Sequence, residues 1–261
     1  MAYGIGYNKM KIGIAGYGYV GKAHELMFKE SHDLIISDPQ QGHYGDLRHA
    51  DAIIICVATP QKEISGHCDV SNVCDVIDQA PDVPILIKST ISPEGWRLIT
   101  DTCKNKNITF SPEFLRANHW EQDTNDCKEF YLGGASTNFW ADLLRFSRGN
   151  VNIHIAEPTE LILAKQLINS FLALKVSYFN QVFDYCKGEG VDFENVRKVI
   201  TDDPRIGGSH SMVSDERGFG GHCFPKDVLA TIRSSVMSAG SRFTLLEEAY
   251  EYNQSLRKET T

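Results

Sequence analysis

The chain has 261 residues, of which 42% are hydrophobic, 23% charged and 10% aromatic. This composition is typical of a globular protein and excludes a disordered, collagen-like or coiled-coil chain. The 34 acidic and 26 basic residues give a formal charge of −8, whereas nucleic-acid-binding proteins need a surplus of Lys and Arg.

The longest apolar run, Ala52–Ala58, is far shorter than the roughly 20 residues of a membrane span. The first nine residues lack the apolar core of a signal peptide and indicate only a short leader. Seven cysteines without C-x-x-C spacing predict free thiols in a reducing compartment, which we expect to be the cytoplasm.

The first half of the chain alternates short apolar segments with helical patterns such as Lys22–Lys29 and Pro93–Lys104. The apolar segments are rich in Ile and Val and are bounded by Gly, Pro, Asp or Ser, as buried parallel strands are. This alternation predicts βαβ units and a doubly wound parallel sheet of the α/β class. The predicted strands are Lys11–Ala15, Leu34–Ser37, Ala52–Ala58, Pro84–Lys88 and Ile108–Ser111, with Phe130–Gly133 and Val151–Ala156 as two further candidates.

From Glu157 onward the pattern is helical. Pro158 suits a first helical turn, and no other Pro or Gly occurs before Gly188. Apolar residues cover most of this helix, so we expect a second subunit to bury it. We therefore expect a Rossmann domain at residues 1–156, and at 157–261 a long helix plus a small all-helical dimerisation domain. Shorter helices are predicted at Glu194–Thr201, Asp227–Ala239 and Thr244–Leu256, with a long loop at Asp202–Lys226.

The segment Gly16-Tyr17-Gly18-Tyr19-Val20-Gly21 fits G-x-G-x-x-G between a predicted strand and a predicted helix. Such glycines permit a tight turn, close backbone approach to a pyrophosphate, and packing of the helix on the sheet. Asp38 ends the second strand, where a carboxylate would hold a ribose 2′-hydroxyl and repel a 2′-phosphate. We predict an NAD site; the alternative is a glycine-rich turn beside an ordinary surface aspartate.

Three further strand ends carry the polar residues Thr59, Thr90 and Glu113. Ligands of open α/β sheets bind beyond the carboxyl ends of the strands, so both threonines are candidates for the nicotinamide side. Each threonine has a helix N-cap as its alternative role.

Lys165 and Asn169 are four residues apart and share one face of the long helix. The lysine either extends its ammonium group to water or stabilises a developing negative charge.

The segment Gly218–Asp227 places Cys223 in a glycine-rich loop next to His222, Lys226 and Asp227. Neighbouring cations favour the thiolate, which can attack an aldehyde and leave an adduct that gives up a second hydride. A buried structural cysteine is the alternative. The adjacent pairs His67-Cys68 and His222-Cys223 lack the spacing of a closed zinc site, so we expect no metal.

Five motifs occur in an order that resembles the UDP-glucose/GDP-mannose dehydrogenases, over about residues 11–254. The resemblance covers the NAD-binding domain and the central helical dimerisation domain of a three-domain enzyme. The motifs are Gly16–Gly21, Lys88-Ser89-Thr90, Ser111-Pro112-Glu113-Phe114-Leu115-Arg116, Lys165-x-x-x-Asn169 and Gly218–Asp227.

The resemblance implies oxidation of a nucleotide-sugar C6 alcohol to a carboxylate with two NAD, in a homodimer formed through the central helix. Cys223 would form a thiohemiacetal and then a thioester, while Lys165 and Asn169 stabilise the C6 oxyanion. Asp227 with Thr90 would position water, and Glu113 would assist proton transfer during hydrolysis.

The remaining sites implied by the resemblance concern binding. The sugar pocket would include Glu113, Phe114, Leu115, Arg116, Lys165, Asn169, Gly220 and Gly221, and Arg205 would reach the substrate of a neighbouring subunit. The cofactor would contact Gly16, Gly18, Tyr19, Val20, Gly21, Asp38, Thr59, Thr90 and Lys226.

Several positions depart from the family pattern. Ala117 and Ile162 stand where the family commonly has Glu, and His222 replaces a small Ser or Thr. The sequence stops at Thr261, before the family's third, nucleotide-binding domain, so we expect weak nucleotide affinity or help from another chain.

Two other functions fit parts of the sequence. A two-domain hydroxyacid dehydrogenase would also place Lys and Asn on the helix after the Rossmann domain, but it needs no thiol. A degenerate NAD-binding or regulatory protein would bind the dinucleotide without turnover.

Overall fold

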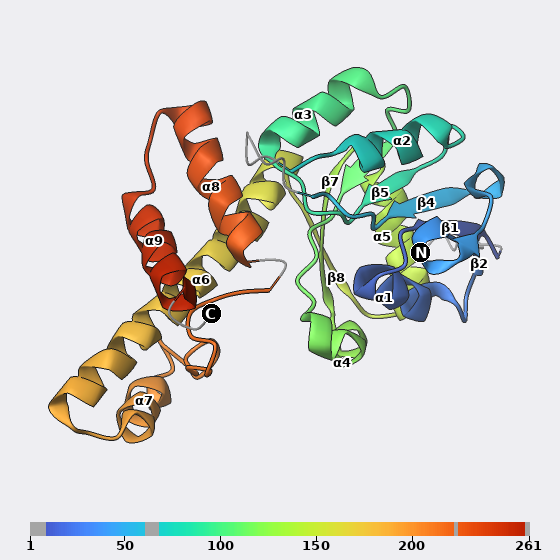
Figure 1. The fold of residues 1–261 in the computed structure, drawn as a ribbon. Coiled ribbons are helices and arrows are strands. Elements are labelled where there is room, and N and C mark those ends of the chain that lie inside the picture. Colours follow the sequence, from blue (N-terminus) through green and yellow to red (C-terminus); the bar gives the residue numbers. More distant parts are fainter. Residues whose placement is uncertain (1–8, 61–67, 222–223, 259–261) are drawn as a thin grey trace. The chain divides into compact units, whose positions relative to one another are not determined.

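The computed structural model describes residues 9–60, 68–221 and 224–258. These residues divide into two compact units, the first ending at Lys165 and the second starting at Gln166. Figure 1 shows the helices and strands of both units.

The first unit is built on one eight-stranded sheet with the order β3-β2-β1-β4-β5-β6-β7-β8. Most neighbouring strands run parallel, and β1 pairs with β2 on one side and β4 on the other. The predicted α/β class and Rossmann topology are confirmed. The strands are β1 Lys11–Ala15, β2 Asp33–Asp38, β3 His43–Tyr44, β4 Ala52–Ile55, β5 Ile85–Ile87, β6 Ile108–Phe110, β7 Glu129–Gly134 and β8 Asn152–Ile155.

Three strands depart from the expected parallel arrangement. β3 runs antiparallel to β2, and β7 runs antiparallel to β6. β8 runs parallel to β7 and so shares its reversed direction. The segment between β6 and β7 holds only a short 3-10 turn and the seven-residue helix α4 (Trp120–Asp126). An antiparallel pair needs no crossover, so this connection leaves β6 and enters β7 at the same end of the sheet.

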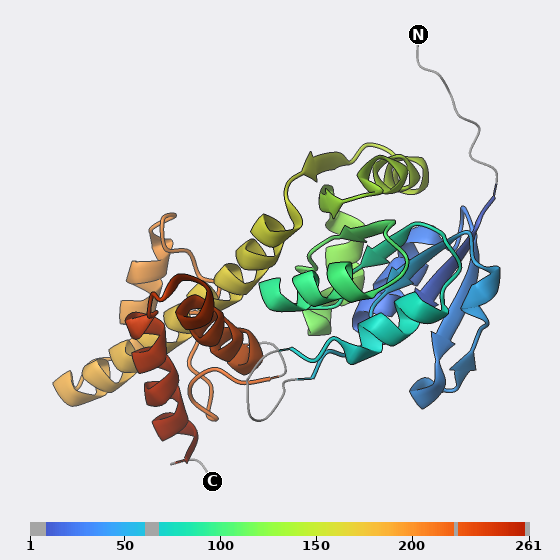
Figure 2. The same cartoon turned by 90° about the horizontal axis from the view of Figure 1, so that it is seen from above.

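Helices cover both faces of this sheet. On one face, α1 (Tyr19–Phe28) and α5 (Thr137–Arg148) bury Phe28 and Trp140 against the strands. On the other face, α2 (Ser71–Gln79) and α3 (Pro93–Thr102) lie side by side and contribute to a separate core, as both views show (Figures 1 and 2). The two apolar cores hold the carboxyl ends of the strands in fixed register.

The second unit is helical. The long helix α6 (Pro158–Glu189) begins in the first unit, and its later turns pack with α8 (Phe224–Ala239) and α9 (Thr244–Lys258) around Ala173, Val228 and Leu246. At the far end of α6, Phe183 contacts Phe193 of α7 (Phe193–Asp202) edge to face. Within the described ranges, no helix combines the length and apolar character that crossing a membrane requires.

Candidate active site

A large cavity lies at the carboxyl ends of β1, β2 and β4 in the first unit, with a volume of about 980 Å³. Gly16 and Gly18 line it from the turn after β1, and Asp38 from the end of β2. Three of the residues predicted to bind the cofactor therefore surround one space. Tyr19, Val20 and Gly21 form the first turn of α1 directly beyond these glycines.

The glycine turn depends on missing side chains. Gly16 has a φ of +87°, and a Cβ there would lie 2.7 Å from the Cys56 carbonyl group. A Cβ on Gly21 would lie 2.2 Å from the Gly16 carbonyl oxygen, so this glycine lets α1 pack against the turn. A Cβ on Gly18 would meet no protein atom within 4 Å, which leaves the backbone at that position open to a ligand.

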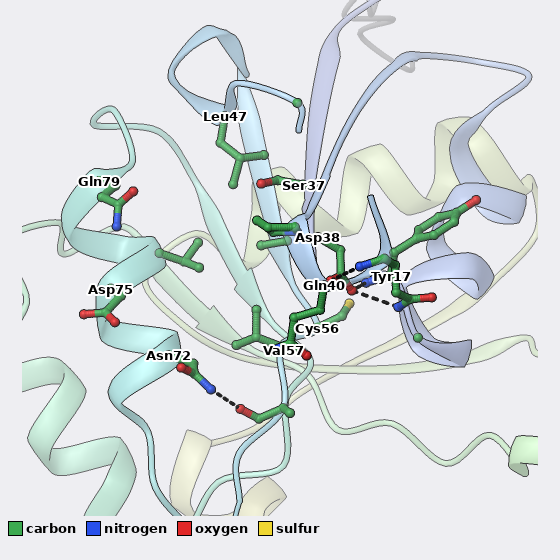
Figure 3. A pocket seen from close by; sticks show the side chains of 18 of the residues that line it. Tyr17, Ser37, Asp38, Gln40, Leu47, Cys56, Val57, Asn72, Asp75 and Gln79 are labelled. Atoms are coloured by element: carbon green, nitrogen blue, oxygen red, sulfur yellow. Dashed lines mark hydrogen bonds between the residues drawn. The ribbon is translucent and has the colours of Figure 1, made fainter. Parts of the chain in front are cut away.

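Asp38 faces the glycine turn (Figure 3). Its carboxylate accepts hydrogen bonds from the Tyr17 amide at 2.7 Å and from the Gln41 side-chain amide at 2.9 Å. Burial opposes ionisation, but these donors outweigh it and hold the pKa of Asp38 below its usual range. An ionised carboxylate at this position accepts hydrogen bonds from ribose hydroxyls and repels a 2′-phosphate.

The wall opposite Asp38 comes from one face of α2, which the sequence reasoning missed. Asn72, Asp75, Val76 and Gln79 line the cavity there, and Asn72 donates to the Ala58 carbonyl at 3.0 Å (Figure 3). Their spacing of three, four and seven residues is the signal that marks one helix face. Polar residues at this spacing also mark an ordinary solvent-exposed face, so the pattern alone does not reveal a pocket.

Thr59 and Thr90 contact each other at the ends of β4 and β5. The buried Thr59 hydroxyl donates to the Thr90 carbonyl oxygen at 2.6 Å. Neither caps a helix, because the N-cap of α2 is Val70 and that of α3 is Ser92, whose hydroxyl accepts the Gly95 amide. Neither threonine lines the large cavity.

A second cavity of about 390 Å³ in the first unit is lined by Glu113, Phe114, Leu115 and Arg116. This brings the predicted sugar-binding segment together beside the end of β6. The Arg116 guanidinium pairs with the carboxylate of Asp123 in α4. The backbone amide of Arg116 donates a further hydrogen bond to that carboxylate at 2.8 Å. The Lys165 ammonium lies 5.4 Å from the centre of the Phe114 ring.

In the second unit, Asn169 and Asp227 are joined although 58 residues separate them. The Asn169 side-chain amide donates to the Asp227 carboxylate at 2.5 Å, and both residues are buried. Ser170 donates to the Thr231 hydroxyl, which in turn donates to the Asp227 carbonyl at 2.8 Å. The structure thus pairs two residues that the sequence placed on separate motifs.

Buried amides hold the chain before the Gly220-Gly221 pair. Asn180 of α6 accepts the Gly218 amide at 3.1 Å. Asn253 of α9 accepts the Phe219 amide at 2.6 Å and donates to the Phe219 carbonyl at 3.0 Å. Arg217, with a φ of +53°, pairs with Asp184 of α6.

Two other predicted residues of the second unit have a described position. Arg205 is exposed and pairs with Asp203, and Lys226 belongs to the first turn of α8. Cys223 and His222 lie outside the described residues. In the described part of the chain, no group of three or more His, Cys, Asp or Glu could hold a metal ion.

Two departures from the family pattern have clear positions. Ile162 is 1% exposed and packs into the core beneath α2 and α3, where a carboxylate would be costly. Ala117 is exposed at the start of a 3-10 turn.

Two family models match this chain. Residues 41–145 match the NAD binding domain of the UDP-glucose/GDP-mannose dehydrogenase family, and residues 160–255 match the central domain of the same family. The chain belongs to the UDP-glucose/GDP-mannose dehydrogenase family. Its cofactor is NAD, and the open Gly18 backbone, the Asp38 carboxylate and the size of the cavity fit that dinucleotide.

Relatives of this family include UDP-glucose 6-dehydrogenases. The one from Rickettsia bellii is 33% identical over 199 residues, which are 71% of this chain and 45% of the relative. The one from Bacillus subtilis is 30% identical over 80% of this chain and 50% of its own length. The chain thus spans about half the length of these relatives.

Solved structures share the fold. A UDP-glucose dehydrogenase from Pyrobaculum islandicum superposes with a TM-score of 0.81 at 23% identity, covering 98% of this chain and 70% of that one. A 3-hydroxyisobutyrate dehydrogenase from Mycobacterium tuberculosis has a TM-score of 0.69 at 17% identity, covering 95% and 94%.

Proposed function

We propose that this chain oxidises the C6 alcohol of a nucleotide sugar of the UDP-glucose type to the uronic acid. Family membership, the cofactor cavity and the relatives named above support the proposal. The observation that carries it is the buried Asn169–Asp227 pair. It joins the long helix to the segment that contains Cys223, as a reaction needing both motifs requires.

The reaction takes four electrons from the sugar in two steps. The alcohol first loses a proton and a hydride and becomes an aldehyde. The Cys223 thiolate adds to the aldehyde carbon, and the oxygen takes up a proton to give a thiohemiacetal. Loss of that proton and of a second hydride then gives a thioester. Water then cleaves the carbon–sulfur bond, which releases the carboxylate and the thiol. NAD, when bound, supplies the acceptor for each hydride.

The other residues stabilise charge and move protons. Lys165 and Asn169 hold the oxygen at C6 as it becomes negative, because both carry donors. The Asp227 carboxylate fixes the Asn169 amide by accepting its N–H. Asp227 and Thr90 position the attacking water, and Glu113 accepts a proton from it.

We also propose a homodimer formed through α6. Phe171, Tyr178 and Tyr185 recur every seven residues along this helix and are 64%, 56% and 69% exposed. A stripe of large apolar side chains at this spacing is typical of a helix–helix interface. Sedimentation should give a dimer for the wild type and a monomer for Phe171→Glu.

The domain boundary and compartment are proposals as well. We place the NAD-binding domain at residues 1–156 and the helical domain at 157–261. Free thiols at Cys56, Cys74, Cys103, Cys127 and Cys186 support a place in the reducing cytoplasm.

The deciding experiment measures NADH formed from NAD and a panel of UDP- and GDP-sugars. The wild type is compared with Cys223→Ser and with Cys186→Ala, which removes a buried thiol of α6. We expect two NADH per sugar, lost in Cys223→Ser and kept in Cys186→Ala.

Other results would replace the proposal. One NADH per substrate with full activity in Cys223→Ser would indicate a hydroxyacid dehydrogenase. NAD binding without NADH from any sugar nucleotide would indicate a protein that binds the cofactor without turnover.

A further inference from the structure

Lys88 is a buried lysine at the end of β5. Its side chain is 5% exposed, and its ammonium group lies 3.3 Å from a carboxylate oxygen of Glu113. The same group donates to the Ser111 hydroxyl at 3.1 Å and to the Pro112 carbonyl at 2.9 Å. All three partners of this ammonium come from the segment that leaves β6.

The Glu113 carboxylate is held from both sides. Its Oε1 accepts the backbone amides of Phe114 at 2.8 Å and Leu115 at 3.1 Å, while Oε2 faces Lys88. Burial opposes ionisation of this carboxyl, but Lys88 and the amides outweigh it and hold the pKa of Glu113 below its usual range. Glu113 is therefore an anion at neutral pH.

Other titratable groups face this pair from α1, from the end of β4 and from the start of β7. His24 is buried, and burial together with the Lys88 charge lowers its pKa to about 4. Burial raises the pKa of the Cys56 thiol strongly and that of the Cys127 thiol as well. All three are uncharged at neutral pH, so the positive charge opposite Glu113 comes from Lys88.

A purely structural role explains this pair poorly. A buried ion pair gains little stability over apolar residues of the same volume, because both charges lose their water. The segment after β6 would be held equally well by apolar packing. The pair does one thing that apolar packing cannot do, which is to keep a carboxylate ionised inside the protein.

We propose that Lys88 is a positioning residue that keeps Glu113 ionised and directs its carboxylate for proton acceptance. The catalytic part of this inference rests on the function proposed above. An ionised carboxylate can take a proton from the water that attacks the thioester, whereas a protonated carboxyl cannot. Lys88 acts through Glu113, whose carboxylate its ammonium group contacts.

The test titrates Glu113 directly in the full chain with NAD bound. Glutamate carboxyl groups are labelled with 13C and followed by NMR against pH, and Glu113→Gln identifies the signal. We expect the titration midpoint of Glu113 in the wild type to lie below the midpoint of an exposed glutamate. In Lys88→Met the Glu113 midpoint should move above that of an exposed glutamate. In Lys88→Arg it should return toward the wild-type midpoint. Lys104→Met, which removes an exposed lysine of the same unit, should leave it unchanged.

An unchanged midpoint in Lys88→Met would overturn the inference. If that variant does not fold, a wild-type midpoint at or above that of an exposed glutamate overturns it equally. In an active enzyme, the acid limb of kcat should also move to higher pH in Lys88→Met, with the NAD affinity unchanged. Full turnover in Glu113→Gln would refute the assigned role of Glu113 and leave the NMR result to decide on Lys88.

Discussion

The two units fix their functional segments in opposite ways. In the first unit the turn after β1 relies on glycines whose missing side chains let backbone meet backbone, as at Gly16 and Gly21. In the second unit the segment before Gly220 is held by buried side-chain amides, those of Asn180 and Asn253. The cofactor turn therefore has no room for a side chain at Gly16 or Gly21. The segment before Gly220 instead depends on the side-chain amides of Asn180 and Asn253.

The largest effect is expected from adding one methyl group to the glycine turn. Gly21→Ala places a Cβ 2.2 Å from the Gly16 carbonyl oxygen, so it should cost about 4 kcal/mol or more of the free energy of unfolding. All three tryptophans, Trp96, Trp120 and Trp140, lie in the first unit, so tryptophan fluorescence in a urea titration reports its unfolding.

Gly18→Ala is the matched control for that variant. Its Cβ meets no protein atom within 4 Å, so stability should hold while NAD affinity falls by about tenfold or more in calorimetry. Wild-type stability in Gly21→Ala would show that the turn has more freedom than this comparison allows.

A smaller effect is expected from pH in the same unit. His24 donates to the Val20 carbonyl at 2.8 Å, and its pKa is lowered to about 4 by burial and by Lys88. Unfolding restores the ordinary value, so the unfolded chain binds more protons between the two values. Stability should therefore fall as pH drops from about 6.5 to 4, by about 3 kcal/mol in total.

Urea titrations at several pH values measure that loss. His24→Gln should flatten the dependence, and His119→Gln, at an exposed position, should not. The same slope in His24→Gln would assign the pH dependence to other groups.

The smallest effect on stability is expected from a substitution in the second unit. Asn253→Ala removes both hydrogen bonds to Phe219 and should cost about 2 kcal/mol. Hydrogen exchange should show faster exchange in α8 and α9, while the tryptophan transition of the first unit stays in place. Glu248→Ala, at an exposed position of α9, should change neither the exchange rates nor the tryptophan transition. An equal loss of stability in both units for Asn253→Ala would contradict the comparison.

The sequence predicted the elements that follow local rules. The five apolar strands and the turn at Gly16 are encoded by neighbouring residues, and Asp38 follows from its distance along the chain. The direction of β7 is not encoded by neighbouring residues, because it depends on where the chain between β6 and β7 lies.

The missed parts of the site depend on contacts between distant residues. In the sequence Lys88 stands out only as part of a motif, because its partner Glu113 is 25 residues away and neither residue shows its burial in the sequence. In the sequence, the residues of α2 around Asp75 have the pattern of an ordinary polar helix face, so they do not indicate a cavity wall. Asn169 and Asp227 likewise belong to separate motifs in the sequence, and only the fold joins them.

The environment of the thiols has a practical consequence for chemical labelling. Burial raises the pKa of Cys74 to about 12 and also raises that of Cys127, while Cys103 and Cys186 are almost fully buried. Alkylating reagents attack accessible thiolates. The raised pKa values keep Cys74 and Cys127 nearly silent at neutral pH, and burial shields Cys103 and Cys186 from the reagent. A mapped iodoacetamide adduct then gives a low-background readout of whether Cys223 is the reactive nucleophile of this chain.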